Sequence, residues 1–430
     1  MSAPPPPLPS AVDTPVLCIP PPDFLADPAL ARVLDALPET RVVGGAVRDA
    51  LLGLPVADID LATPRPPEAV IAALHAAGLR ALPTGLAHGT ITALADGRGF
   101  EITTLRRDVT TDGRHAVVAF TADWRADAAR RDFTLNALSL TRDGAVFDYF
   151  AGLADLRAGH VRFVGDPATR IAEDYLRILR FFRFHARYGR GAPDPAALAA
   201  IRAGAAGIDA LSPERVWSEL RLLLATADPG GAIALMDACG VLSHVLPEGA
   251  DLQRLARLLA AGAPADPLLR LTALLAGDAA RLADRLRLST AERTRLIALR
   301  AGPVPHPEDD ENALRRLLAG TEPDILLGRV WLADDGAPGW AALRARLAAL
   351  PPPMFPLAGR DVLALGVPPG PRVGALLGAV RAWWLAGGCQ ANAADCREAL
   401  AARIRAGEEA AEDEPPRPPT GEAGSPNRPR

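Results

Sequence analysis

No run of about eighteen consecutive apolar residues occurs in this 430-residue chain, so we expect no membrane-spanning helix. The first ten residues, MSAPPPPLPS, are rich in proline and uncharged, and so do not resemble a signal peptide. This difference favours a cytoplasmic protein. Cysteine is scarce as well, and the four cysteines form no Cys-x-x-Cys pair: Cys18, Cys239, Cys389 and Cys396. We therefore expect reduced thiols, with neither a zinc site nor disulfides.

An excess of positive charge is also missing, because the formal net charge is −4. This balance excludes a uniformly basic coat for nucleic acid, so any RNA contact must come from local arginine patches. The length of 430 residues predicts about two to four domains, and the hydrophobic fraction of 49% predicts that they are globular. We expect irregular structure in the proline-rich residues 1–22 and in the acidic, proline-rich residues 407–430.

The segment Arg41–Thr63, RVVGGAVRDALLGLPVADIDLAT, combines two features that bind phosphate and metal. The Gly44-Gly45 turn lets backbone amides approach a phosphate, and Arg48 follows about one helical turn later. Asp58 and Asp60 are two residues apart, so in a strand they project to the same side. Two adjacent carboxylates beside a phosphate site suit Mg²⁺. A tight turn followed by a solvated aspartate pair is the simpler alternative, but the combination of both motifs favours a site.

Further along, the hairpin signal Asp96-Gly97 joins two β-like runs, Thr90–Ala95 and Phe100–Leu105. Glu101 lies on the second run and is either a third acidic group near the metal or a partly exposed strand residue. Residues 110–127 are polar and predict a loop. Arg130 and Arg131 follow, flanked by acidic residues, which indicates that ion pairs hold them in place.

A helix is expected from about Pro167, with arginines on one side and apolar residues on the other. The polar side carries Asp174, Arg177, Arg180 and Arg183, with few acidic neighbours at helical spacing. A solvated arginine face normally has such neighbours, so this face is interpreted as ligand-binding. A second helix is expected to start at Ser212-Pro213 and to run through Leu224.

Taken in order, these motifs resemble the bacterial class II tRNA nucleotidyltransferase and poly(A) polymerase family. The resemblance covers about residues 40–220 through GGAVRD, Asp58-Ile59-Asp60, RRDFTLNA, EDYLRILR and SPER. It implies an α+β fold, with a polymerase-β-like nucleotidyltransferase head followed by all-α neck, body and tail domains. The implied divisions are a head at 23–152, a neck at 153–225, a body at 226–350 and a tRNA-binding tail at 351–406.

The resemblance also implies roles for single residues. Residues matching Asp58 and Asp60 hold two Mg²⁺ ions and carry out catalysis. Those matching Asp174 and Arg177 read the incoming base. The remaining implied nucleotide contacts match Gly44, Gly45, Arg48, Arg130, Arg131, Arg180 and Arg183, and the choice between Arg130 and Arg131 stays open.

The base-reading role is chemically sensible. Cytosine and adenine each present an exocyclic amine beside a bare ring nitrogen, so a carboxylate accepts from the amine while a guanidinium donates to the nitrogen. Uracil and guanine present a carbonyl beside an N–H and leave both protein groups unmatched. One Asp–Arg pair thus accepts both CTP and ATP.

The expected function is addition of C, C and A to the tRNA 3′ end from CTP and ATP, by two-metal nucleotidyl transfer and without a stable protein partner. The alternatives are a poly(A) polymerase and a catalytically inactive RNA-binding protein of the same fold. No His-Asp pair of an HD phosphohydrolase domain is present in the sequence. The glycine-rich residues 359–374 are either an RNA-backbone contact or a helix-capping loop.

Overall fold

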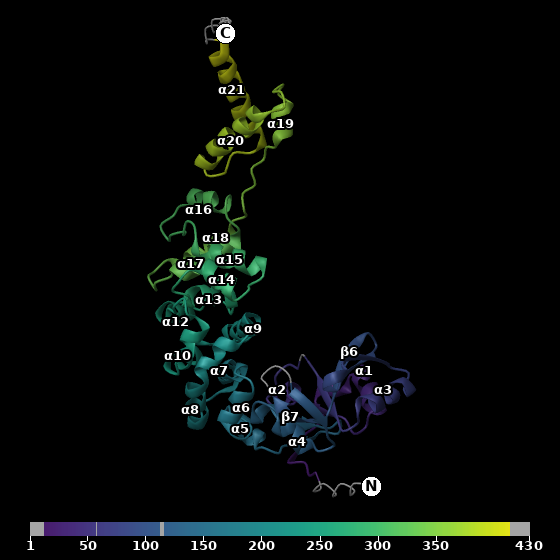
Figure 1. Ribbon diagram of the computed structural model, residues 1–430. Helices are drawn as coiled ribbons and strands as arrows, with labels where there is room; N and C mark the ends of the chain where they lie inside the picture. The colour runs from purple at the N-terminus through teal and green to yellow at the C-terminus, as the bar shows by residue number, and fades with distance from the viewer. Residues whose placement is uncertain (1–12, 57, 112–115, 413–430) are drawn as a thin grey trace, which may run out of the picture. The chain divides into compact units, whose positions relative to one another are not determined.

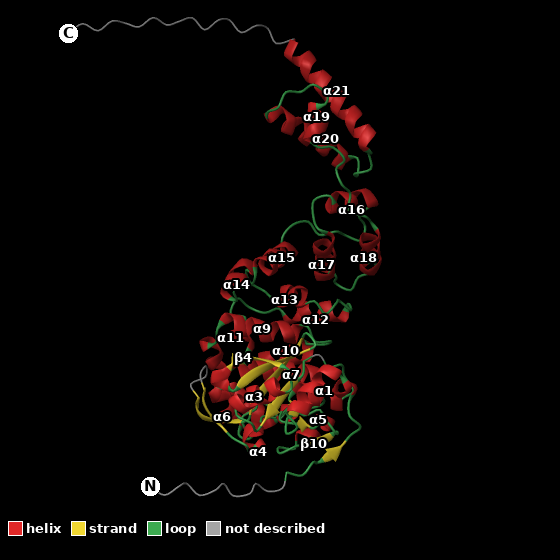
Figure 2. Ribbon diagram, turned by 90° about the vertical axis from the view of Figure 1, so that its right-hand side faces the viewer, coloured by secondary structure: helices red, strands yellow, loops and turns green. Residues whose placement is uncertain are grey.

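The computed structural model describes residues 13–56, 58–111 and 116–412. The chain divides into two compact units, Met1–Leu296 and Ile297–Arg430. Strands belong to the N-terminal part of the first unit, and helices make up the rest of the chain (Figures 1 and 2). The predicted α+β fold with a mixed-sheet head and a helical remainder is confirmed.

The head is built on a sheet with the order β1-β10-β9-β2-β3-β6-β5-β4. Its strands are β1 (Leu17–Cys18), β2 (Arg41–Val43), β3 (Asp60–Thr63), β4 (Arg80–Gly85), β5 (Thr90–Ala95), β6 (Arg98–Thr104), β9 (Ser139–Leu140) and β10 (Ala145–Phe147). β3 and β6 run parallel, whereas β2 pairs antiparallel with both β3 and β9. The predicted hairpin is β5–β6. β1 lies within the stretch for which the sequence predicts irregular structure.

Helices α1 (Pro28–Ala36) and α3 (Pro67–Ala76) lie beside the β4–β5–β6 end of the sheet (Figure 1). α1 begins where the Asp27 carboxylate accepts a hydrogen bond from the Ala29 amide, which satisfies one free N–H of the first turn. Its buried face carries Leu30 and Val33. β5 alternates between half-buried and buried residues, as expected for a strand with one face on the core.

The expected loop at 110–127 is wrong in part. β7 (Arg106–Thr111) and β8 (Ala116–Phe120) form an antiparallel pair, and α4 (Trp124–Ala129) follows. Asp123 starts α4 by accepting from the amides of Arg125 and Ala126. The central residues of the expected loop, 112–115, lie outside the described residues.

The first unit continues as helices. They are α5 (Gly152–Ala158), α6 (Pro167–Glu173), α7 (Leu176–Tyr188), α8 (Pro195–Gly204), α9 (Pro213–Leu224), α10 (Gly230–Ala238), α11 (Leu242–Val245), α12 (Leu252–Ala260), α13 (Pro267–Leu274) and α14 (Ala279–Arg285), with α15 (Thr290–Arg300) at the division. α7 packs against α9 and α10. Its apolar side is buried through Ile178, Leu179 and Phe182. The predicted helix to Leu224 is α9.

The second unit contains α16 (Glu311–Leu318), α17 (Pro323–Ala333), α18 (Trp340–Ala349), α19 (Gly359–Leu363), α20 (Pro371–Ala386) and α21 (Ala393–Glu412). One apolar cluster forms around Leu314, Val330 and Trp340, and another around Val380 and Trp384. Two predictions are corrected here. The glycine-rich stretch 359–374 contains α19 and the start of α20, and α21 continues to Glu412, beyond the expected start of disorder at 407.

None of the helices in the described ranges is long and apolar enough to cross a membrane. Cys18, Cys239, Cys389 and Cys396 are free thiols in the structure.

Candidate active site

A cavity of about 740 Å³ lies in the first unit, between the head and α7. Arginine and aspartate dominate its walls. Its charged lining residues are Arg48, Asp49, Asp58, Asp60, Arg131, Asp132, Asp174, Arg177, Arg180, Arg183, Arg187 and Arg215. Seven arginines against five aspartates make the cavity net positive within a chain of net charge −4, which favours an anionic ligand. The chain contains no lysine, so every cationic group able to meet a phosphate is a guanidinium or a histidine.

The Gly44-Gly45 turn joins β2 to α2 (Gly45–Leu51) and lines this cavity. Gly44 has φ +69°, and a Cβ there would lie 3.2 Å from Nη1 of Arg131. Glycine is therefore required both by the backbone conformation and by the closeness of an arginine. Arg48, on α2, is buried and donates to Oδ1 of Asn136 at 2.5 Å.

Asp58 and Asp60 reach solvent and line the same cavity. Asp60 is the first residue of β3, whereas Asp58 precedes the strand. Partial burial raises the pKa of Asp60 above its ordinary value; the Arg131 charge opposes the rise and the Asp58 charge adds to it. Glu101 is the register neighbour of Asp60 on β6, but it does not line the cavity.

The structure separates the two adjacent arginines. Arg131 lines the cavity, and Arg130 does not. Both pair with Asp127, Arg130 at 2.8 Å and Arg131 at 3.2 Å. Burial alone raises the pKa of Asp127, but the Arg130 and Arg131 charges outweigh it and leave this pKa below its usual range. Asp127 therefore stays ionised and fixes both guanidinium groups.

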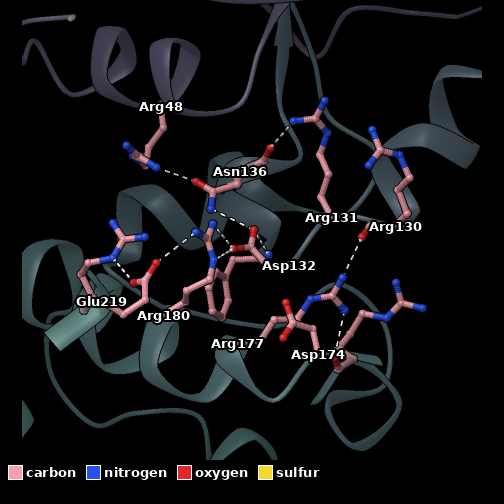
Figure 3. Close-up of polar contacts among 12 residues, drawn as sticks. Arg48, Arg130, Arg131, Asp132, Asn136, Asp174, Arg177, Arg180 and Glu219 are labelled. Carbon is pink, nitrogen blue, oxygen red and sulfur yellow. Dashed lines mark hydrogen bonds and ion pairs between the residues drawn. The ribbon is translucent and has the colours of Figure 1, made fainter. Parts of the chain in front are cut away.

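Asp132 is the centre of a buried hydrogen-bond network (Figure 3). Its carboxylate accepts from Nε and Nη2 of Arg180 at 2.8 and 2.5 Å, and from Nδ2 of Asn136 at 3.0 Å. Burial favours the neutral acid, yet the Arg180 charge and these hydrogen bonds lower the pKa of Asp132. Because Asn136 also accepts from Arg48, the network ties α2 in the head to α7.

Glu219, a buried residue of α9, extends this network. It lies 3.5 Å from Nη1 of Arg180 and accepts from Nε of Arg183 at 2.6 Å (Figure 3). Sequence reasoning missed Asp132, Asn136 and Glu219 as site residues. The first two lie four residues apart inside the RRDFTLNA motif, which was the available signal. For Glu219 no local signal exists, because its partners lie on another helix.

The expected continuous helix from Pro167 is broken at Asp174. α6 ends at Glu173, Asp174 has extended backbone angles (φ −160°, ψ 107°), and α7 starts at Leu176. Oδ1 of Asp174 accepts from the Leu176 amide at 3.1 Å, a local bond that competes with helix continuation. Asp174 and Arg177 are therefore not neighbours on one helical face, although both line the cavity.

Each of these two residues is held by a further partner. Oδ2 of Asp174 accepts from Nη2 of Arg215 at 2.6 Å. Arg177 donates to Glu173 at 2.5 Å and to the carbonyl oxygen of Arg170 at 2.9 Å. The arginine face thus has acidic partners after all, but most of them come from distant segments.

The positions predicted from sequence now divide into two groups. One cavity collects Gly44, Gly45, Arg48, Asp58, Asp60, Arg131, Asp174, Arg177, Arg180 and Arg183. Arg130 and Glu101 lie outside its lining. The cavity thus offers guanidinium groups to an anionic ligand and carboxylates to a cation or a hydrogen-bond donor.

Comparison with known families finds two matching models. Residues 40–162 match the poly A polymerase head domain, and residues 192–252 match the probable RNA and SrmB-binding site of polymerase A. The first match contains the two carboxylates and Arg131, and the second contains α9 with Arg215 and Glu219.

Full-length relatives and solved structures agree with these matches. The mouse (Mus musculus) mitochondrial CCA tRNA nucleotidyltransferase 1 is 39% identical over 365 residues, covering 80% of this chain and 82% of the relative. The CCA-adding enzyme of Levilactobacillus brevis is 32% identical, covering 82% and 91%. The structure of the Bacillus stearothermophilus CCA-adding enzyme in complex with CTP superimposes with a TM-score of 0.70 at 27% identity, over 89% of this chain and all of that one. With this identity over four-fifths of both chains, the protein belongs to the family of the CCA-adding enzymes, the class II tRNA nucleotidyltransferases.

Proposed function

We propose that this protein adds C, C and A to the 3′ ends of tRNA, using CTP and ATP, by nucleotidyl transfer without a nucleic-acid template. The observation that carries the proposal is the single cavity that Asp58 and Asp60 share with Asp174 and Arg177. The carboxylate pair serves the transfer, and the second pair has the chemistry to choose the base. A cytoplasmic location is part of the proposal, and the four free thiols are compatible with it.

Asp174 and Arg177 are suited to read cytosine and adenine. Asp174 supplies an acceptor for the exocyclic amine, and Arg177 supplies a donor for the ring nitrogen. Ion pairs with Arg215 and Glu173 limit the movement of both side chains. This preorganisation supports discrimination between bases, because the two side chains cannot rearrange to form hydrogen bonds with uracil or guanine.

Arginines along the cavity are suited to hold the triphosphate and ribose. Both arginines pair with Asp127, but only Arg131 lines the cavity, so we assign the predicted contact of this pair to Arg131. Arg180 and Arg183 present guanidinium groups that Asp132 and Glu219 orient from behind. Guanidinium forks bind phosphate oxygens in a bidentate manner, which fixes a triphosphate more precisely than a point charge does.

Nucleotidyltransferases of this family use divalent metal ions, and the carboxylates here fit such an ion. Asp58 and Asp60 both face the cavity, and the Asp58 charge adds to the burial that raises the pKa of Asp60. Within the described residues no group of three or more metal-ligating side chains occurs. Two carboxylates completed by substrate phosphates and water suit Mg²⁺. When bound, Mg²⁺ would activate the 3′-hydroxyl and steady the leaving pyrophosphate.

In the reaction, the RNA 3′-oxygen forms a bond to the α-phosphorus as the bond to the pyrophosphate oxygen breaks. The hydroxyl proton needs an acceptor, and the carboxylate of Asp58 or Asp60 could receive it. Arg131, close to both Asp60 and the Gly44 backbone, is placed to balance the negative charge that develops on the phosphate.

The test is extension of a tRNA transcript lacking its CCA end, with Mg²⁺ and with CTP and ATP supplied separately and together. We expect two cytidines with CTP alone, and with both nucleotides a CCA end followed by a stop. A long adenosine tail would indicate the poly(A) polymerase instead, and binding without extension would indicate the inactive RNA-binding protein.

A further inference from the structure

A second, smaller cavity of about 240 Å³ adjoins the candidate active site. Its apolar wall comes from Leu52 and Leu54, just after α2, and from Leu156 on α5. The opposite wall is the end of α7 and the residues that follow it, with Arg187, Tyr188 and Arg190. An apolar surface facing two arginines suits a planar, hydrophobic group that carries an anion.

Arg187 and the segment after α2 connect the two cavities. Arg187 lines both. The segment after α2 contributes Leu52 and Leu54 to the smaller cavity and Pro55 and Val56 to the larger one. Asp58 follows two residues after Val56, so a ligand in the smaller cavity lies next to the segment that carries the catalytic carboxylates.

Asp49 forms the partition between the cavities. It lines the larger one and accepts from the hydroxyl of Tyr188, on the wall of the smaller one, at 2.9 Å. Burial raises the pKa of Tyr188 to about 12, so the hydroxyl stays protonated and keeps donating. The ring of Tyr188 is also covered by Arg48, whose guanidinium carbon lies 4.4 Å from its centroid. This wall is therefore rigid.

The two arginines of the smaller cavity are available to a ligand. The Arg187 side chain is 49% exposed and makes only a loose ion pair with Asp49, at 3.7 Å. Arg190 is exposed, and within the described ranges its side chain has no hydrogen-bond or ion-pair partner. By contrast, Arg177, Arg180 and Arg183 in the larger cavity are each held by a carboxylate at 2.6 Å or less.

We propose that the smaller cavity receives the last nucleotide of the RNA to be extended, with its base against Leu52, Leu54 and Leu156 and its phosphates at Arg187 and Arg190. This inference rests on the proposed function. If the incoming nucleotide fills the larger cavity, the RNA 3′-hydroxyl must come within about 3–3.5 Å of its α-phosphorus, so the last RNA base lies in the neighbouring space. A single-stranded RNA end is typically held by packing of its base and by arginine on its backbone.

Photocrosslinking tests the location. The probe is a tRNA transcript that lacks CCA and has 4-thiouridine as its last nucleotide. Irradiation with the full-length protein should crosslink this nucleotide to residues 52–54 or 187–190, assigned by fragment ions of the tryptic peptides. Excess unlabelled CTP, added in metal-free buffer so that the probe is not extended, should leave the crosslink in place, because the incoming nucleotide belongs in the larger cavity. Crosslinks confined to other segments, or competition by CTP, would overturn the proposal.

Kinetics test the role. In Arg190→Gln, the KM for tRNA should rise roughly three- to tenfold, and the salt slope of tRNA binding should fall by about 0.7, as for one lost phosphate contact on a single strand. The KM for CTP should not change. Leu54→Ser should raise the tRNA KM but leave the salt slope unchanged. The matched control is Arg281→Gln, an exposed arginine of α14 that lines neither cavity and lies outside the segment matched to an RNA-binding site.

Wild-type CCA addition separates this inference from the proposed function. An inactive wild-type protein refutes the proposed function itself. Normal wild-type addition, with Arg190→Gln and Leu54→Ser indistinguishable from the Arg281 control, refutes only the RNA-end site.

Discussion

We predict that Asp174 and Arg177 together select the incoming base. Arg177→Ala removes the donor for the ring nitrogen of cytosine and adenine, and Asp174→Ala removes the acceptor for the amine. Use of CTP and ATP should fall, whereas use of UTP and GTP should change little because those bases never matched the pair. The preference for CTP and ATP should therefore narrow in both variants.

The size of the effect follows from the surroundings of the two side chains. A hydrogen bond to a charged group contributes about 1.5–3 kcal/mol, which corresponds to about ten- to a hundredfold in relative kcat/KM. The Arg177 side chain is 15% exposed and that of Asp174 is 25% exposed, so Arg177 should lie toward the upper end of this range. Neither change leaves a buried partner uncompensated: Glu173 keeps Arg170 at 2.6 Å, and Arg215 is 34% exposed to water.

The assay is single-nucleotide incorporation with each of the four nucleoside triphosphates, on tRNA ending before the first C and on tRNA ending in CC. Arg281→Ala serves as the control and should keep wild-type discrimination. A Glu173→Gln variant, which keeps the Arg177 donor but weakens its anchor, should lose less discrimination than Arg177→Ala. An equal loss of activity with all four nucleotides would mean that the pair supports the fold and does not read the base.

Three further predictions concern the acidic residues of the site. Asp58→Ala or Asp60→Ala should abolish nucleotide incorporation and leave tRNA binding nearly intact in a filter-binding assay. Turnover above roughly a tenth of the wild-type rate would contradict the metal-holding role, because it corresponds to a barrier change of only about 1.4 kcal/mol. Asp60→Asn should raise the thermal midpoint in metal-free buffer at neutral pH. Burial raises the pKa of Asp60, so its charge lowers stability as the pH rises through that pKa, and an unchanged or lower midpoint would contradict this burial effect. Asp132→Asn should cost about 3 kcal/mol of unfolding free energy, because it leaves Arg180 without its main partner. Because the pKa of Asp132 is lowered in the folded protein, its ionised form adds stability above the ordinary carboxyl pKa, and this stability is lost as the pH falls through the pKa in the folded state. The difference in unfolding free energy between wild type and Asp132→Asn, measured by urea titration, should therefore shrink toward acid pH. A difference that does not change with pH would argue against the ion pair.

Much of the head and of the site could be predicted from the sequence, because the signals there are local. The Gly44-Gly45 turn is required by backbone conformation, and the structure places it at the cavity wall. The Asp96-Gly97 hairpin was recognised from turn chemistry alone. The apolar and arginine sides of α7 follow from helical periodicity, which is set by backbone geometry and not by any distant partner.

Where local signals compete, the sequence was ambiguous and the tertiary structure decided. The apolar pattern is continuous through residues 167–188, but the side chain of Asp174 bonds the Leu176 amide and ends the helix there. The sequence of residues 110–127 predicts a loop because polar residues and a glycine flank the short apolar run 116–120. β7 and β8 form because they pair with each other. Helix and strand ends depend on such alternatives, which differ by single hydrogen bonds.

The partners of the arginines were decided only by the tertiary structure. Asp132 and Glu219 lie 48 and 36 residues from the arginines whose guanidinium groups they hold, and nothing in local periodicity links them. The same packing turns Arg130 toward Asp127 and leaves Arg131 at the cavity, although the two are adjacent in sequence. Sequence patterns determine which face of an element is apolar or charged, but the identity of the facing residue depends on how distant elements pack.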